Sequence, residues 1–221
     1  MSLGKKRIFI VDDHPIVRKG LIQVINKQKN METCGSAADA ASALSFLEKD
    51  KPDLLILDIS LENSNGLDLL KDISARNENI PVLVLSMHDE NVYAERALNA
   101  GARGYIMKQR VTKELIKAIL TVLAGKIYLS DEVSSKILDK KTKNDSGNNS
   151  DITDILSDRE LEVLQYTGEG LTTEEIAGRL NLGIKSIETY KSKIKDKLDL
   201  KNSNRLIKFA VEWVISKNNT R

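Results

Sequence analysis

Short apolar runs and helix-period segments alternate over about the first 120 residues of the chain. Five short segments predict strands, at 8–11, 32–36, 53–58, 81–86 and 104–108. All but the weak second one are mainly apolar and end in or directly precede polar residues, as strands buried on both faces do. Between them, apolar residues recur at helical spacing and predict helices that start near Pro15, Ala40, Leu67, Val92 and Thr112. This alternation predicts a five-stranded parallel sheet with helices on both faces and right-handed crossovers.

The third of these runs ends in a carboxylate. Leu54 to Leu57 are four consecutive apolar residues, and Asp58 follows them. Ligands of open α/β sheets bind at the carboxyl ends of the strands, so Asp58 stands where chemistry is expected. Asp also commonly forms the turn after a strand, and this strand alone leaves the two interpretations open.

The second half of the chain has a different pattern. Residues 130–138 predict one further short helix, and residues 140–150 contain no apolar residue, which is typical of a flexible linker. From residue 152 onward all apolar spacing is helical. We therefore expect an α/β domain at 5–124, a short helix and linker at 125–151, and an all-α domain at 152–217, without an internal repeat.

Composition excludes several classes of protein. Of the 221 residues, 41% are hydrophobic and 30% charged, so cores can be buried, and no apolar run approaches the roughly 20 residues that span a bilayer. Ile8 to Val11 is followed at once by two acidic residues, so it is not a signal peptide. The single cysteine, Cys34, excludes an internal disulfide framework. We expect a cytoplasmic protein that does not associate with membranes.

Polar residues at the ends of the predicted strands should meet at one edge of the sheet; they are Asp12, Asp13, Asp58, Ser86, Tyr105 and Lys108. Three converging carboxylates repel one another unless a cation lies among them. Mg²⁺ prefers oxygen ligands and accepts few carboxylates. Mg²⁺, a lysine and a hydroxyl together suit a phosphoryl group, and an Asp carboxylate can be its acceptor. Each residue alone has a simpler explanation, as turn former, helix cap or surface charge, but their joint occurrence favours a site.

Residues 5–124 resemble the receiver domain of two-component response regulators, through Asp12-Asp13, the strand Leu54 to Asp58, Gly66, Ser86 and the run from Gly101 to Lys108. The resemblance implies a flavodoxin-like fold in which Asp58 accepts phosphate from a histidine kinase. It also implies Mg²⁺ held by Asp12, Asp13, Asp58 and the backbone carbonyl of Ser60. Lys108 would contact the phosphoryl oxygens, Ser86 would move onto them, and Tyr105 would swing inward.

The chain departs from the receiver pattern at one position, and two further positions are variable among receivers. Gln109 stands where many receivers carry a proline, so the cis peptide expected there is not assured. Ser60 and His88 resemble the variable positions that tune dephosphorylation.

The C-terminal segment carries helix signals of its own. Ser157 with Glu160, and Thr172 with Glu175, form capping boxes. Thr172 caps a short helix, a turn at 181–183 follows, and the next helix is expected at 186–198. The two helices and the turn between them form a helix-turn-helix candidate. Residues 185–205 hold seven Lys or Arg against three acidic residues, an excess of four positive charges. A basic face at such a position is typical of DNA binding, although a solvated lysine-rich face would look the same by charge alone.

Residues 156–202 resemble the LuxR-type DNA-binding domain, with matches that include Leu156, Arg159, Glu160, Gly170, Ile176, Leu180, Ile194 and Leu198. Tyr190 stands where many members have histidine, and Gly183 where serine or proline is frequent. By this resemblance Glu188, Thr189 and Ser192 would face bases in the major groove. The side chains expected to contact mostly phosphates are Lys185, Tyr190, Lys191, Lys193 and Lys197.

Together the two halves resemble a NarL/FixJ-type response regulator. This implies a transcription factor that is not an enzyme beyond slow self-dephosphorylation. Its partners would be a cognate histidine kinase, double-stranded promoter DNA and a second copy of the chain when phosphorylated. Two rivals remain. A phosphatase with an Asp nucleophile usually needs a second acid where Ser60 stands, and a flavin module needs a phosphate-cradling first loop, where Asp12-Asp13 would repel phosphate.

Overall fold

The computed structural model describes residues 4–61, 64–76, 79–142 and 152–218. The chain divides into two compact units, residues 1–146 and 147–221, and each is described by itself. Among the described helices, none combines the length and the apolar character that crossing a membrane requires.

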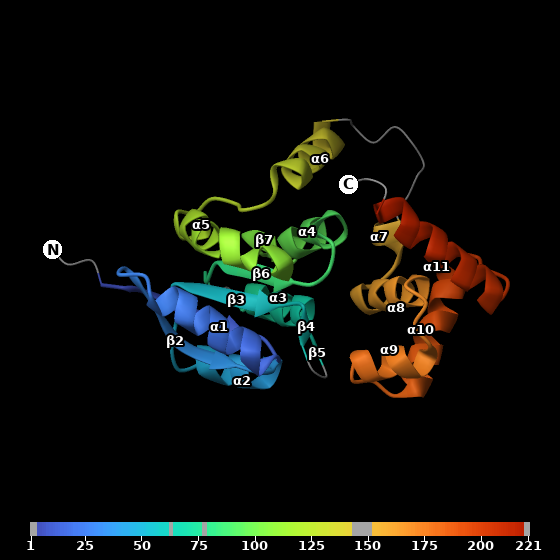
Figure 1. The fold of residues 1–221 in the computed structure, drawn as a ribbon, viewed down its shortest axis with the longest axis horizontal. Helices are drawn as coiled ribbons and strands as arrows, with labels where there is room; N and C mark the ends of the chain where they lie inside the picture. Colours follow the sequence, from blue (N-terminus) through green and yellow to red (C-terminus); the bar gives the residue numbers. More distant parts are fainter. Residues whose placement is uncertain (1–3, 62–63, 77–78, 143–151, 219–221) are drawn as a thin grey trace. The chain divides into compact units, whose positions relative to one another are not determined.

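The N-terminal unit is built on a five-stranded parallel sheet (Figure 1). Its order is β2-β1-β3-β6-β7, with β1 at Lys6–Val11, β2 at Met31–Ala37, β3 at Leu54–Asp58, β6 at Val82–Ser86 and β7 at Gly104–Met107. All residues of β3, β6 and β7 are buried. This explains their continuous apolar runs and confirms the predicted flavodoxin-like sheet.

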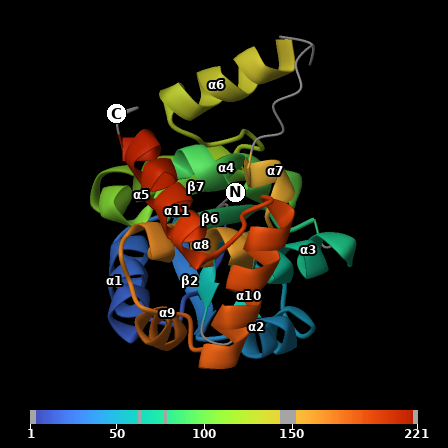
Figure 2. The ribbon, with the colours of Figure 1, turned by 90° about the vertical axis from the view of Figure 1, so that its right-hand side faces the viewer.

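Helices cover both faces of this sheet (Figure 2). Helices α1 (Pro15–Asn26) and α5 (Val111–Leu123) pack through Leu21, Ile25, Leu115 and Ile119 on one face. Helix α2 (Ala40–Leu47) lies on the other, where the Phe46 ring stacks on Phe9. Helix α3 (Gly66–Ala75) lies between α2 and α4 (Glu90–Asn99), since Arg76 pairs with Glu48 and Ser74 donates to the Ala100 carbonyl.

A short hairpin follows the central strand. Strands β4 (Ser60–Leu61) and β5 (Ser64–Asn65) pair antiparallel and lead into Gly66. A Cβ on Gly66 would lie 2.0 Å from the backbone oxygen of Asp58. Only glycine therefore lets this hairpin fold back against the end of β3.

Some predicted details differ. The exposed fraction of Ile16 is 85% and that of Leu120 is 46%, although both fit the helical apolar pattern. On α2, Ala43 and Leu47 are buried, while Leu44, which fits the same helical apolar pattern, is only partly so. Lys108 begins a 3-10 turn, Lys108–Arg110, rather than ending β7.

Helix α6 (Asp131–Thr142) runs beyond its predicted end into the first residues of the predicted linker. The rest of that linker, 143–151, lies outside the described residues.

The C-terminal unit is helical, with α7 at Ile152–Ile155, α8 at Asp158–Gly168, α9 at Thr173–Arg179, α10 at Ile184–Lys197 and α11 at Ser203–Asn218. Both capping boxes predicted from the sequence are present, at Ser157 and Thr172. Gly168 contacts α11 closely, because a Cβ there would lie 2.3 Å from the Ala210 carbonyl oxygen. Ile187 and Ile194 form the buried stripe of α10.

Candidate functional site

Acidic side chains and one lysine meet at the carboxyl edge of the sheet. The Lys108 Nζ atom lies 2.7 Å from Asp12 Oδ2 and 2.6 Å from Asp58 Oδ2. Both carboxylates are only 1% exposed and the lysine side chain 9%. Because β1 and β3 are neighbours and β7 lies on the far side of β6, only the lysine's long side chain lets it reach both acids.

Two further residues complete this group, which we call the acid rim and define as Asp12, Asp13, His14, Asp58 and Lys108. One ligand atom from each of its three acids and from His14 fits within a span of 4.8 Å. Asp13 Oδ1 contacts His14 Nδ1 at 2.5 Å, and the backbone N–H of His14 donates to Asp12 Oδ1. The sequence did not single out His14, which follows the acidic pair directly.

The donor set of the acid rim fits a divalent cation. Asp12 Oδ2 and Asp13 Oδ1 are buried, and neither accepts a hydrogen bond from the residues that the structure describes. Each faces a nitrogen instead, Lys108 Nζ at 2.7 Å and His14 Nδ1 at 2.5 Å. Buried carboxylate oxygens left this way favour a hard cation with oxygen ligands.

The acid rim also shifts the protonation of its members. Burial raises the pKa of Asp58 to about 6, with help from the Asp12 carboxylate, although the Lys108 ammonium acts in the opposite direction. Burial lowers the pKa of Lys108, but the attraction of Asp58 and Asp12 outweighs it, so the net shift is upward. Lys108 therefore stays charged, and the protonation of Asp58 depends on the charges placed near it.

A second group of polar residues surrounds His88, which is buried. Its Nε2 lies 2.9 Å from the Ser60 hydroxyl, and its backbone N–H donates to Ser86 Oγ at 3.1 Å. Its carbonyl accepts from the Tyr105 hydroxyl at 3.0 Å. His88 thus joins three residues that the sequence placed at the site, a role that no local sequence signal revealed.

Tyr105 lies in an inward position. Its side chain is 1% exposed and its hydroxyl donates to the His88 carbonyl, and burial raises its pKa, which keeps the phenol protonated. Ser60 lies beside the acid rim, with its N–H donating to Asp58 Oδ1 at 3.1 Å.

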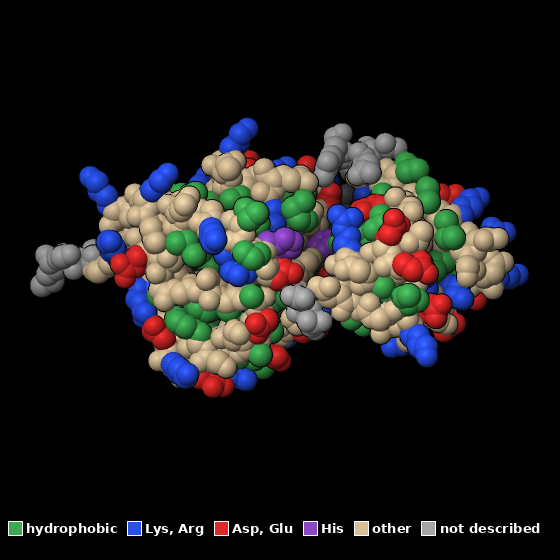
Figure 3. Space-filling model, turned by 60° about the horizontal axis from the view of Figure 1, so that its bottom comes forward, with side chains coloured by type: hydrophobic (Ala, Val, Ile, Leu, Met, Phe, Trp, Pro, Cys, Tyr) green, Lys and Arg blue, Asp and Glu red, His purple; other side chains and the backbone are tan. Residues whose placement is uncertain are grey.

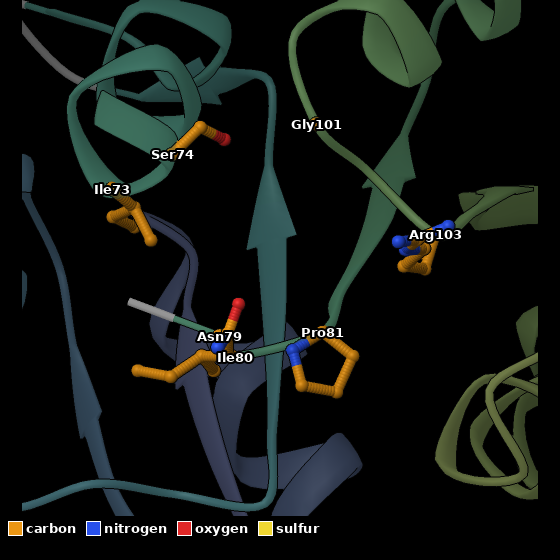
Figure 4. A pocket seen from close by; sticks show the side chains of 7 residues that line it. All are labelled: Ile73, Ser74, Asn79, Ile80, Pro81, Gly101 and Arg103. Carbon is orange, nitrogen blue, oxygen red and sulfur yellow. The ribbon is translucent and has the colours of Figure 1, made fainter. Parts of the chain in front are cut away.

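A pocket of about 340 Å³ lies elsewhere on the same unit (Figure 4), lined by Ile73, Ser74, Asn79, Ile80, Pro81, Gly101 and Arg103. Pro81 directly precedes β6 and Arg103 directly precedes β7. The pocket therefore opens at the amino ends of these strands, opposite to the acid rim.

In the C-terminal unit, α9 and α10 form the predicted helix-turn-helix. Their turn contains Asn181 with a φ of 49°, a left-handed conformation that asparagine tolerates. The side chains expected to face bases, Glu188, Thr189 and Ser192, are exposed, as are Lys185 and Lys193. Over the face that Figure 3 presents, positive and negative side chains are interspersed, which fits a chain whose net charge is only +2.

The structure gives two of the predicted phosphate-contacting lysines partners within the domain. The Lys191 ammonium donates to Thr173 Oγ1 at 3.0 Å. Lys197 Nζ lies 2.7 Å from Glu160 Oε2 and also donates to the Ile155 carbonyl. Lys191 is thus positioned at the start of α9, whereas Lys197 ties α10 to the capping box of α8.

Comparison with known proteins agrees with this arrangement. Residues 8–120 match the family described as "Response regulator receiver domain", and residues 154–210 match "Bacterial regulatory proteins, luxR family". The oxygen regulatory protein NreC of Staphylococcus aureus is 34% identical over 210 residues, which span 93% of this chain and 97% of NreC.

Solved structures of response regulators also match nearly the whole chain. RcsB from Salmonella enterica serovar Typhimurium, bound to promoter rprA in the presence of phosphomimetic BeF3-, is 27% identical with a TM-score of 0.60, over 94% of this chain and 99% of that one. A structure of two RcsB dimers bound to two parallel DNAs is also 27% identical, with a TM-score of 0.57, over 93% and 98%. With a receiver fold, an acid rim and a LuxR-type helix-turn-helix in one chain, this protein belongs to the response regulators that control transcription.

Proposed function

We propose that Asp58 accepts a phosphoryl group from a cognate histidine kinase, and that this modification switches dimerisation and DNA binding. The observation that carries the proposal is the acid rim itself. A buried carboxylate, paired with a buried lysine and crowded by two more acids, has no structural advantage over an apolar residue. It suits a site where a charged group arrives and leaves.

The transfer is a displacement at phosphorus. A carboxylate oxygen of Asp58 forms the new O–P bond while the N–P bond of the kinase's phosphohistidine breaks, and the leaving imidazole nitrogen keeps the electron pair and takes up a proton. Lys108, held between Asp12 and Asp58, is placed to neutralise phosphoryl oxygens. With a pKa of about 6, Asp58 is mostly ionised near neutral pH and can act as the nucleophile.

Mg²⁺ would be held by the carboxylates of Asp12, Asp13 and Asp58 with the backbone carbonyl of Ser60. When bound, it would neutralise charge on the carboxylates and on the phosphoryl oxygens. The buried oxygens of Asp12 and Asp13 that lack hydrogen bonds support this set. Ser60, where a phosphatase would carry its acid, supports a phosphoacceptor with at most slow self-dephosphorylation rather than an enzyme.

The output would be binding of the C-terminal domain to promoter DNA in the cytoplasm. Ser86 and Tyr105, joined through His88, would respond to the phosphoryl group and bias the receiver between two states. The exposed face of α10 would then enter the major groove. The DNA-bound RcsB dimers support a homodimer, because two linked helix-turn-helix units bind paired half-sites more tightly than one.

DNA-site selection with and without acetyl phosphate and Mg²⁺ tests this proposal, with Asp58→Ala as the matched control. We expect the donor to increase both dimer content and affinity for the selected site in the native protein alone. Equal binding and equal oligomeric state in all four samples would contradict the switch.

A further inference from the structure

The segment after α5 is attached to the edge strand of the sheet. Tyr128 forms a parallel one-residue bridge with Gly104. The Tyr105 N–H donates to the Tyr128 carbonyl at 2.9 Å, and the Tyr128 N–H donates to the Arg103 carbonyl at 3.0 Å. The chain that leads out of the receiver is therefore hydrogen-bonded to the strand that carries Tyr105.

A buried acid binds the next part of the same segment, just before α6. Glu90, the first residue of α4, is 5% exposed, and its Oε1 accepts from the Ser130 N–H at 2.7 Å. Ser130 immediately precedes α6, where backbone N–H groups lack partners within the helix. The Arg110 guanidinium lies 3.9 Å from the other Glu90 oxygen. Burial raises the pKa of Glu90, against the hydrogen bonds from Ser130 and the attraction of Arg110.

Helix α6 is held on α4 through its first turns. Val133 is buried, and Lys136 Nζ donates to Asn91 Oδ1 at 2.8 Å. The first turns of α6 are thus held by contacts of Ser130, Val133 and Lys136. Segments held at the protein surface in this way are the ones that open locally.

Glu90 also lies close in sequence to the polar residues of the proposed site. His88 precedes it by two residues, and the His88 N–H is held by Ser86 Oγ. If Ser86 Oγ turned toward a phosphoryl group on Asp58, it would move away from the His88 N–H. The backbone from Ser86 to Glu90 would lose that restraint.

We infer that Glu90 is a latch that docks α6 on α4 while Asp58 is unmodified, and that phosphorylation of Asp58 releases it. The release half of this inference rests on the proposed function. The latch half rests only on the contacts of Glu90 and Ser130. Freed of the latch, the segment that leads to the DNA-binding domain gains the freedom to reorient.

Hydrogen–deuterium exchange of the full chain tests both halves. Glu90→Ala removes the acceptor for Ser130, whereas Glu90→Gln keeps an oxygen there. Without phosphoryl analogue, we expect amides of residues 130–137 to exchange at least tenfold faster in Glu90→Ala and at the native rate in Glu90→Gln. Asp68→Ala, an exposed acid on α3, is the matched control and should leave these amides unchanged. Native exchange in Glu90→Ala would overturn the latch.

Adding beryllofluoride with Mg²⁺ tests the release. We expect it to speed exchange at 130–137 in the native protein, to add nothing in Glu90→Ala, and to have no effect in Asp58→Ala. An equal further increase in Glu90→Ala would show that Glu90 is not the latch. If beryllofluoride left the whole native receiver unchanged, the proposed function would fail, and the comparison without analogue would still decide the latch.

Discussion

The acid rim and the outer face of α10 carry the two halves of the proposed function in opposite physical settings. In the acid rim, residues up to about a hundred positions apart meet in a buried space, and Lys108 is shared by two carboxylates. On α10 the proposed contacts come from one continuous stretch and most are exposed. A buried charge responds strongly to one neighbour, whereas an exposed charge is screened. Single changes should therefore have large, specific effects in the acid rim and small, additive effects on α10.

Replacing Asp58 gives the largest expected effect. Asp58→Asn removes the acceptor oxygen's charge while keeping the shape, so labelling by a phosphoryl donor should fall by at least a hundredfold. Phosphate-affinity electrophoresis measures this directly. Asp53→Asn is the control, because this acid directly precedes β3 and lies outside the site, and it should label normally. Undiminished labelling of Asp58→Asn would place the acceptor elsewhere.

Replacing Lys108 comes next. Lys108→Met leaves the buried carboxylates of Asp12 and Asp58 without their cation, which should cost about 3 kcal/mol of unfolding free energy. Urea unfolding of the receiver followed by circular dichroism measures this loss at pH 7.5. Combining Lys108→Met with Asp58→Asn should recover part of it, because one of the two repelling charges is then gone. A single variant as stable as the native protein would mean that Lys108 does not bridge the two acids.

Lysines on α10 should have smaller and more uniform effects. Lys193→Ala should weaken binding to every DNA sequence by roughly the same factor and reduce the slope of affinity against salt by about 0.9. Glu188→Ala should instead change which sequences are preferred, because base contacts carry specificity. Titrations at several salt concentrations separate the two. Unchanged affinity and slope for Lys193→Ala and Lys191→Ala alike would rule out this docking.

Replacing Lys197 should give the smallest effect on DNA binding, because this lysine is paired within its own domain. It bonds to Glu160, so Lys197→Met should lower the stability of the C-terminal domain by about 1 kcal/mol and change the salt slope less than Lys193→Ala does. Burial acts to raise the pKa of Glu160, but the bonds from Lys197 and Ser157 lower it overall. The stability difference should therefore be present above the ordinary glutamate pKa, about 4.3, and disappear as pH falls through the lowered value. Thermal unfolding between pH 3 and 7 measures it. A difference that grew toward acid pH would contradict the bridge.

The sequence alone predicted the receiver fold because its signals are local and repeated. Apolar runs bounded by polar ends and helical periodicity set the alternation of strands and helices, and short-range hydrogen bonds set the capping boxes at Ser157 and Thr172. Asp12, Asp58 and Lys108 could be assigned to one edge because parallel strands all end on the same side. Their direct contact agrees with that rule.

Tertiary structure decided what depends on partners distant in the chain. Strands β4 and β5 fold back against the end of β3 because Gly66 leaves room for them. His88 joins Ser60, Ser86 and Tyr105 only once β3, β6 and β7 are side by side. Periodicity assigned Ile16 to the helix pattern but could not show that its side chain is 85% exposed. In the sequence, Lys197 is one of several basic residues on its helix, and only the structure shows that it pairs with Glu160. Local propensity determines which elements form, whereas the burial and pairing of a side chain depend on which elements meet.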